Sequence, residues 1–398
     1  MRDFESLSKP RPSEWCIMRF GDVVRNVKVD VDPETSGLER YIAGEHMETD
    51  NLHIHQWGTI GDGYLGPAFH RKFVSGQVLY GSRRTYLRKV AVAEFDGVCA
   101  NTTFVLDAKE DVLLQELLPF IMQTEGFTQH SILHSKGSVN PYINWKDIAC
   151  YEFPLPPLDE QRRIADILWA ADAAIVKWKT VLEQVEQARN AFRSSFFGGE
   201  RGWKRSKLGD LFDVQLGKML SPKARRGISP KPYLGNVNVQ WGWFDLSNVK
   251  TMDFDEEEFE KFALKPGDLL VCEGGEVGRS AIWMGQIEDC CYQKALHRLR
   301  LLNDQLMPEI LLQFMFYAAQ HGLFARLTGH STIAHLTAVK LRMLRVPVPP
   351  AEEQQRAIDA FEHFEWSVKS TEQHLERVRD VKDELLESLL VPSRGSAM

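Results

Sequence analysis

Short clusters of lysine and arginine stand in segments with the composition of loops, and such clusters can bind phosphate groups. Lys223-Ala224-Arg225-Arg226 is flanked by Pro222 and Gly227, which indicates a loop. Phosphate contacts supply much of the affinity of DNA-binding proteins, and polar loop side chains read base edges. An ordinary solvated charge is the alternative at every such position. The further candidates are Arg71, Lys72, Arg83, Arg84, Arg88, Lys136, Ser138, Lys218, Asn236, Arg279, Ser280, His330 and Ser331.

Two motifs could in principle belong to an enzyme. Gly-Asp-Gly-Tyr-Leu-Gly at 61–66 matches the dinucleotide pattern GxGxxG, which needs a helix directly after it. Pro67 follows instead, so we interpret the segment as a turn-rich loop. Asn-Pro-Tyr at 140–142 is similar to the Asn-Pro-Pro-Tyr loop of amino-methyltransferases but lacks one proline. We therefore predict no catalytic residue in this chain.

Histidine and cysteine give no metal-binding pattern. His53 and His55 could place two imidazoles on one side of a strand, but we identify no carboxylate or cysteine ligands to complete a metal site. The six cysteines form no CxxC pair, so neither zinc nor a disulfide framework is predicted. Reduced thiols fit a cytoplasmic protein best.

The composition is that of a globular protein with two or three domains. Of 398 residues, 43% are hydrophobic and 26% are charged. The net charge of −7 argues against nucleic acid as a partner, yet it is uneven: −5 over residues 1–156 and +3 over 200–349. Local clusters must therefore carry any argument for DNA. We expect no membrane segment, because no apolar run reaches ~18 residues, and no secretory signal, because the N-terminus lacks an apolar stretch.

The chain repeats itself about 190 residues apart. Pro-Leu-Pro-Pro-Leu-Asp-Glu-Gln at 154–161 returns as Pro-Val-Pro-Pro-Ala-Glu-Glu-Gln at 347–354. Further matches appear in the same order, and between them the two copies diverge almost completely. A duplication predicts two similar units. The other matched segments are Phe-Gly-Asp-Val at 20–23 with Leu-Gly-Asp-Leu at 208–211, Gly-Gln-Val-Leu at 76–79 with Gly-Asp-Leu-Leu at 267–270, and 117–122 with 310–315.

Each copy is predicted to be a mixed α/β domain. Strand composition marks residues 90–95, 103–106, 268–272 and 295–301. Amphipathic helices are predicted at 112–125 and 308–326.

After each proline segment, apolar residues alternate at spacings of four and three, which is the pattern of a coiled-coil seam. Shifted by 193 residues, the two registers coincide, and Arg189 and Lys382 interrupt them at the same slot. Each of these cations is expected either to pair with a carboxylate on the facing helix or to extend its charge to solvent. The other seam residues are Ile164, Leu168, Ile175, Trp178, Leu182, Phe192, Phe361, Val368, Leu375, Val378 and Leu385.

The predicted fold class is α+β. Two similar mixed α/β domains, at 1–156 and 200–349, alternate with long helices at 157–199 and 350–392, and a tail follows at 393–398. Two seams of equal length most simply pack on each other. A pseudo-twofold axis between the halves would make this coiled coil antiparallel, with the domains at opposite ends.

This arrangement resembles the specificity subunit of type I restriction–modification systems. The resemblance rests on the two divergent units, each closed by a Pro-x-Pro-Pro-x-x-Glu-Gln segment and a long helix. It covers nearly the whole chain. The segment Gly-Asp-Leu-Leu-Val-Cys-Glu-Gly-Gly-Glu-Val-Gly-Arg at 267–279 is also similar to target recognition domains of that family, whereas the first copy has Gly-Ser-Arg-Arg at 81–84 at the corresponding place.

The resemblance implies that each target recognition domain reads one half of a bipartite double-stranded DNA site while the helices set the gap. The subunit would carry no catalysis. It would bind two modification (methyltransferase) subunits that use S-adenosylmethionine and, through them, restriction/translocase subunits that use ATP and Mg²⁺. Two alternatives remain open from the residues: a scaffold that does not read DNA, and a methyltransferase or nuclease that works alone.

Overall fold

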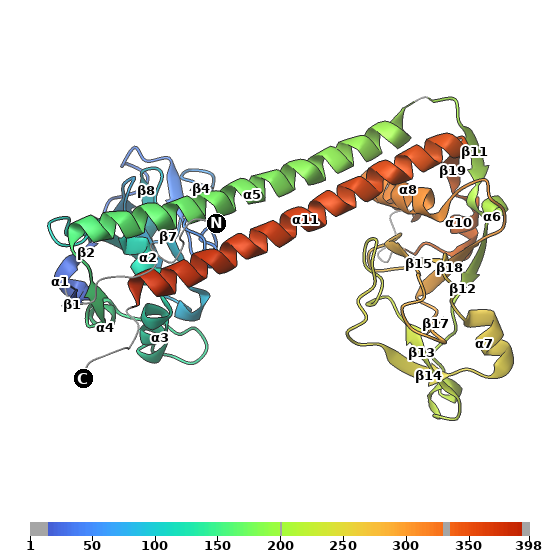
Figure 1. The fold of residues 1–398 in the computed structure, drawn as a ribbon, viewed down its shortest axis with the longest axis horizontal. Coiled ribbons are helices and arrows are strands. Elements are labelled where there is room, and N and C mark those ends of the chain that lie inside the picture. Colours follow the sequence, from blue (N-terminus) through green and yellow to red (C-terminus); the bar gives the residue numbers. More distant parts are fainter. Residues whose placement is uncertain (1–14, 200, 329–334, 392–398) are drawn as a thin grey trace, which may run out of the picture. The chain divides into compact units, whose positions relative to one another are not determined.

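The computed structural model describes residues 15–199, 201–328 and 335–391 (Figure 1). The chain divides into two compact units, one of residues 1–180 with 372–398 and one of residues 181–371. Helix α5 (Leu158–Gly198) begins in the first unit and ends in the second. Helix α11 (Ala351–Leu390) begins in the second unit and ends in the first. The two predicted long helices are confirmed. The predicted domain limits stay predictions, and the tail at 393–398 lies outside the described residues.

The first unit is built on two four-stranded sheets, ordered β2-β9-β6-β7 and β4-β3-β8-β5, and on the short pair β1-β10. Helices α2 and α3 and both long helices pack on its core. Its other elements are β1 (Cys16–Arg19), α1 (Phe20–Val23), β2 (Val24–Val27), β3 (Arg40–Ile42), β4 (Gly58–Thr59), β5 (Phe69–Phe73), β6 (Val78–Gly81), η3 (Thr85–Leu87), β7 (Val90–Val92), β8 (Gly97–Ala100), β9 (Thr103–Ala108), α2 (Leu118–Gln123), α3 (Glu125–Leu133), α4 (Trp145–Ala149) and β10 (Glu152–Leu155).

The second unit repeats this plan with sheets β12-β18-β15-β16, β14-β13-β17 and β11-β19. Strand β15 is buried along its whole length between β18 and β16, as its run of apolar residues predicts. The elements are β11 (Lys204–Lys207), α6 (Leu208–Leu211), β12 (Phe212–Leu216), η4 (Lys223–Arg225), β13 (Pro230–Leu234), β14 (Lys250–Asp253), α7 (Glu256–Phe262), β15 (Leu269–Cys272), β16 (Ser280–Ile282), β17 (Cys291–Tyr292), β18 (Leu296–Leu301), α8 (Pro308–Gln320), α9 (Leu323–Thr328), α10 (Ala338–Met343) and β19 (Arg345–Val348).

Two repeated glycines have a physical reason. Gly76 and Gly267 both have a φ of +90°, which L side chains rarely adopt, and each turns the chain into β6 or β15. Gly21 lies so close to Ala149 of α4 that an added Cβ would come within 2.7 Å of the alanine Cβ. Gly209 has the corresponding contact with Arg342 of α10. The glycines of the duplicated motifs therefore stand where a larger side chain would strain the backbone or clash with a neighbouring helix.

The glutamine that ends each proline motif ties a long helix to its domain. Gln161 accepts from Leu114 N at 2.9 Å and donates to Val112 O and Pro156 O, both at 2.8 Å. Gln354 makes the same three bonds, with Met307 N, Gln305 O and Pro349 O. Both side chains are almost fully buried. A buried amide with its bonds satisfied fixes geometry, and an unsatisfied one destabilises.

Both predicted amphipathic helices are broken, which corrects their extents. Helix α2 covers only Leu118–Gln123, because Thr124 leaves helical geometry and its side chain caps α3 by accepting from Phe127 N. The second helix stops at Gln320, and Gly322, with φ +65°, separates α8 from α9. Helix propensity read from the sequence could not locate the positions at which these helices end.

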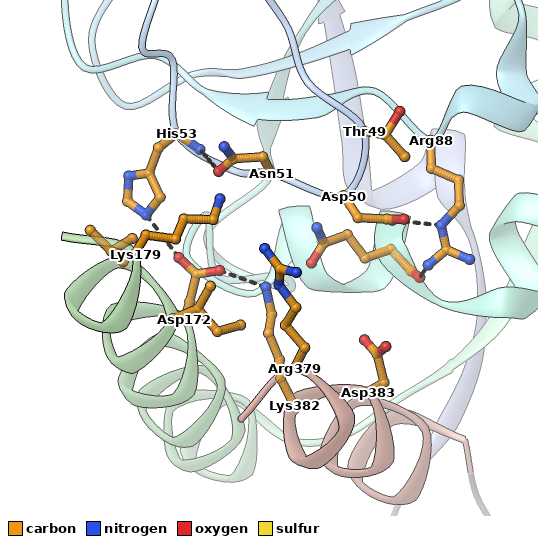
Figure 2. A pocket seen from close by; sticks show the side chains of 13 residues that line it. Thr49, Asp50, Asn51, His53, Arg88, Asp172, Lys179, Arg379, Lys382 and Asp383 are labelled. Carbon is orange, nitrogen blue, oxygen red and sulfur yellow. Dashed lines mark hydrogen bonds and ion pairs between the residues drawn. The ribbon is translucent and has the colours of Figure 1, made fainter. Parts of the chain in front are cut away.

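In the first unit, a buried ion pair joins the long helices. Lys382 of α11 donates to Asp172 of α5 at 2.5 Å, and each side chain is only 6% exposed. His53, on the loop after β3, bonds the same carboxylate at 2.8 Å (Figure 2). The other nitrogen of the ring bonds Glu94 at 2.9 Å. Figure 2 shows Lys382, Asp172 and His53 at the edge of a polar pocket of about 440 Å³ between that loop and both helices.

The second unit holds the counterpart of this ion pair. Arg189 of α5 donates to Glu365 of α11 at 2.8 Å. A shift of 193 residues converts Arg189 into Lys382 and Asp172 into Glu365, so one pair was duplicated with the domains. Contacts at 172/382 and 178/374 in one unit, and at 189/365 and 192/361 in the other, all run antiparallel. Both interrupting cations thus pair with the facing helix.

The seam packs unevenly along the helices. Ile164, Leu168 and Phe361 are buried because they also contact the domain cores. Ile175, Trp178 and Leu182 are only half-buried, and the Trp178 ring stacks on His374 at 4.9 Å.

Replacing Lys382 by methionine should destabilise the chain more than replacing Arg189. Methionine keeps the apolar stem but leaves Asp172 as a buried carboxylate with His53 as its remaining partner, which should cost about 3 kcal/mol. Glu365 is 56% exposed, so Arg189→Met should cost less than about 1 kcal/mol. Urea denaturation measures both losses. Equal losses would show that burial does not set the strength of these pairs.

His53 should make stability depend on pH. Its hydrogen bond to Asp172 raises the pKa of His53, against the effect of burial. The protonated ring can donate to both carboxylates, so its stabilisation is complete below the ordinary histidine pKa of about 6.5 and disappears as the pH rises through the raised pKa. Urea midpoints of the wild type should therefore fall over this interval. In His53→Gln the fall should be absent, whereas exposed His55→Gln should keep it. An unchanged pH profile in His53→Gln would contradict this assignment.

Candidate nucleic-acid interface

Several of the predicted phosphate-binding cations are held inside the protein. Arg88 bonds Asp50 at 2.6 Å, Glu125 at 3.1 Å and Gln123 O at 2.7 Å. The Lys218 side chain is 10% exposed, and its amine lies 2.5 Å from both Glu258 and Asp253 O. These cations hold loops together, so their charges are largely neutralised by the protein.

Four cations of the first unit instead surround a hollow of about 630 Å³, which we call the basic hollow. Lys28, Arg71, Arg83 and Lys146 line it, and none of the aspartates and glutamates that the structure describes does. Arg71 is bonded to Asp30 at 2.8 Å, whereas Lys28, Arg83 and Lys146 are exposed. In a stretch whose net charge is −5, these three exposed cations form a local cluster of positive charge.

Backbone bonds hold the loops of the basic hollow in place. Ile143 N donates to Ser82 O at 2.9 Å, and Ser82 N donates to Thr102 O at 3.0 Å. Arg84 N donates to Pro141 O at 2.6 Å. Arg84 has a φ of +50°, an uncommon conformation for a non-glycine residue that these bonds fix. The hollow is therefore formed by the protein itself, without a ligand.

Aromatic and amide groups line the hollow beside the cations. Phe104 and Trp145 pack edge-to-face with ring centroids 6.1 Å apart, and the Tyr142 side chain is 44% exposed. Asn26 lines the hollow, and its buried Oδ1 has no hydrogen-bond partner within the described chain. Asn101 is exposed on the β8–β9 turn. Amides can read base edges, and cations can bind phosphates.

A second hollow of about 370 Å³ adjoins the first, because both are lined by Arg83 and Thr102. It adds Arg84, which donates to Asn140 at 3.3 Å, and Lys89. Lys136 and Ser138 lie on the neighbouring loop, where Lys136 bonds Asp147 at 3.1 Å. Lys72 is half-buried on β5, beside Arg71.

The second unit brings its predicted residues together in two places. Lys223, Arg225 and Arg226 are exposed at η4, where Lys223 is 3.7 Å from Asp255. Arg279 donates to Asn236 O at 2.9 Å and to Glu276 at 3.3 Å, so it supports the loop of the Glu-Gly-Gly segment.

Ser280 is fully buried and has no hydrogen-bond partner for its hydroxyl within the described chain, so it does not face solvent. His330 and Ser331 lie outside the described residues.

The sequence did not single out Lys28, Asn101 and Lys146. Each is an isolated polar residue on a different segment, and only the folded domain brings them together. The one available signal was Asn-Pro-Tyr at 140–142, whose tyrosine pairs through its backbone with Lys136.

The GxGxxG match lacks the helix that a dinucleotide site requires. Residues 61–66 follow β4 as turns, and strand β5 rather than a helix comes next. Among the residues that the structure describes, no group of three or more histidine, cysteine, aspartate or glutamate side chains could hold a metal ion. None of the described helices combines the length and apolar character that crossing a bilayer requires.

Comparisons with known proteins agree with this organisation. The family model "Type I restriction modification DNA specificity domain" matches residues 12–187 and again 200–379. The EcoDI type I restriction enzyme specificity subunit of Escherichia coli is 29% identical over half of this chain, and the match spans only 45% of that protein. The MjaVIII specificity subunit of Methanocaldococcus jannaschii is 21% identical over 95% of this chain and 92% of its own length.

A solved structure from work on complex assembly and conformational transition of the type I R-M system has the same fold. It has a TM-score of 0.65 at 19% identity and covers 96% of this chain and 100% of its own. The family model covers most of the sequence, once in each half. The chain therefore belongs to the type I restriction modification DNA specificity family, and it is a specificity subunit, a DNA-recognition rather than a catalytic component, that carries the family's domain twice.

Proposed function

We propose that each domain reads one half of a bipartite double-stranded DNA site and that the helical pair sets the gap between the halves. The basic hollow carries this proposal for the first domain, because it brings together exposed cations and amides that offer phosphate and base contacts. Half-site spacing follows the spacing of the reading elements. Two helices that each run from one unit into the other, with a register fixed by paired charges, suit a spacer.

We further propose that two modification subunits, which bind S-adenosylmethionine, assemble on this chain. Restriction/translocase subunits that use ATP and Mg²⁺ would join through them, in the cytoplasm, where the DNA is. The absence of a convincing catalytic motif in the sequence supports this division of labour. A scaffold without DNA recognition, and a methyltransferase or nuclease that works alone, are the competing functions.

Selection from random duplexes tests the proposal. The chain, assembled with its modification subunit, should enrich a split motif with a fixed gap. Replacing residues 1–155 by those of a relative should change one half of that motif only, because each domain reads its half independently. Sequencing of bound duplexes is the measurement. Binding without sequence preference would favour the scaffold, and methylation by this chain alone with labelled S-adenosylmethionine would favour the lone enzyme.

The basic hollow predicts which side chains matter for affinity. Lys28→Ala and Arg83→Ala should each weaken binding and make the plot of log affinity against log salt less steep by about 1, because one phosphate contact is lost. Fluorescence anisotropy over a salt series measures both effects.

Arg25→Ala is the matched control for this experiment. Arg25 is an exposed cation on the same strand as Asn26, and successive side chains of a strand point to opposite faces. Its loss should leave the salt dependence unchanged. Equal effects of Arg25→Ala and Lys28→Ala would rule out the hollow as the contact surface.

A further inference from the structure

One difference between the two copies lies where a long helix packs on a domain helix, α5 on α2 in the first copy and α11 on α8 in the second. Residue 169 of the first copy corresponds to residue 362 of the second, 193 residues later. Trp169 occupies the first position, and its Nε1 donates to Glu116 O at 3.0 Å. Its ring packs edge-to-face on Phe120 with centroids 5.0 Å apart. In the first copy an aromatic side chain of the chain itself thus covers this part of α2.

The second copy has Glu362 at this position, and the corresponding place is open. A hollow of about 230 Å³ lies there between α8 and α11, which we call the apolar groove. Leu312, Ile358 and Phe361 form its apolar part, and all three belong to the core of the second unit. The second copy therefore has an apolar hollow at the equivalent place, with Gln313 where the first copy has Phe120, and it lacks the side chain that fills this place in the first copy.

Carboxylates surround the apolar groove. Glu309 and Glu362 are exposed at its rim. Glu365 also lines it, and Arg189 offsets the charge of that residue from 2.8 Å. The rim is therefore negative, and an apolar ligand that carried acidic neighbours would be repelled.

We infer that the apolar groove is a docking site for an aromatic side chain, tryptophan foremost, presented by another protein on a segment rich in lysine and arginine. The first copy shows that an indole fits between the equivalent helices, where Trp169 donates to Glu116 O and packs on Phe120; the groove has Glu309 and Gln313 at these two positions. The acidic rim selects basic neighbours. Aromatic anchors in apolar pockets with charged rims carry much of the binding energy of protein interfaces. This inference does not depend on DNA reading by either domain.

Titration of the full chain with a short capped peptide tests the inference. The probe carries one tryptophan between lysines, and two matched peptides replace the tryptophan by alanine or the lysines by glutamates. Calorimetry should show saturable binding of the first peptide, none of the alanine peptide, and binding weaker by about fivefold or more for the glutamate peptide. Absence of saturable binding at millimolar concentrations of the first peptide would overturn the inference.

Glu362→Trp should fill the apolar groove from within, as Trp169 does in the first copy. Peptide binding should disappear, and the melting temperature should rise by about 2–4 °C. Glu372→Trp, at an exposed α11 position that does not line the groove, should change neither. Peptide binding that persists in Glu362→Trp would place the binding site elsewhere.

A rim reversal, Glu309→Lys with Glu362→Lys, alters only exposed residues and keeps the test independent of core packing. It should invert the preference, so that the glutamate-flanked peptide binds better than the lysine-flanked one. An unchanged preference would contradict the role of the rim.

A wild-type dimer that dissociates on Glu362→Trp substitution would assign the groove to a second copy of the chain and overturn the choice of a different protein.

Discussion

The duplicated ion pair between the long helices is the constraint on which the rest of the structure depends. An apolar seam alone would tolerate a slip of one heptad or a reversal of direction, because leucine and isoleucine pack similarly in many registers. A cation that must meet one carboxylate excludes those alternatives. Lys382 meets Asp172, and Arg189 meets Glu365, and the two pairs occupy equivalent slots. The charges therefore specify an antiparallel register that the apolar residues only stabilise.

The buried glutamines fix the position of each long helix relative to its own domain. Gln161 and Gln354 each bond the helix start to the segment that precedes α2 or α8. A rotation of either helix would leave three polar groups unsatisfied in the interior, which is costly. These bonds tie the domain to the helix within each unit, so a change of helix register would strain the attachment of the domain.

The sequence predicted the duplicated frame because that frame is periodic and repeated: the heptads, the glycines and the proline segments all recur with a shift close to 193. It did not predict the basic hollow, whose Lys28, Asn101 and Lys146 come from three separate segments with no shared pattern. It also could not separate Arg88 and Lys218, which are neutralised by distant carboxylates, from Arg83, which is exposed. A cation looks the same in sequence whether or not the fold places an acid beside it.

The divergent loops also change the energetics of the shared frame. Burial alone would raise the pKa of Asp172, but His53 and Lys382 outweigh that effect and hold it below the usual value. Glu365, its counterpart, is 56% exposed and has Arg189 as its cation. One sequence slot therefore holds a buried charge in the first copy and a solvated one in the second, because the first domain places its His53 loop against the helix. A domain exchanged into the first position must accordingly bring a loop that satisfies Asp172, or the helical pair beneath it loses part of its stability.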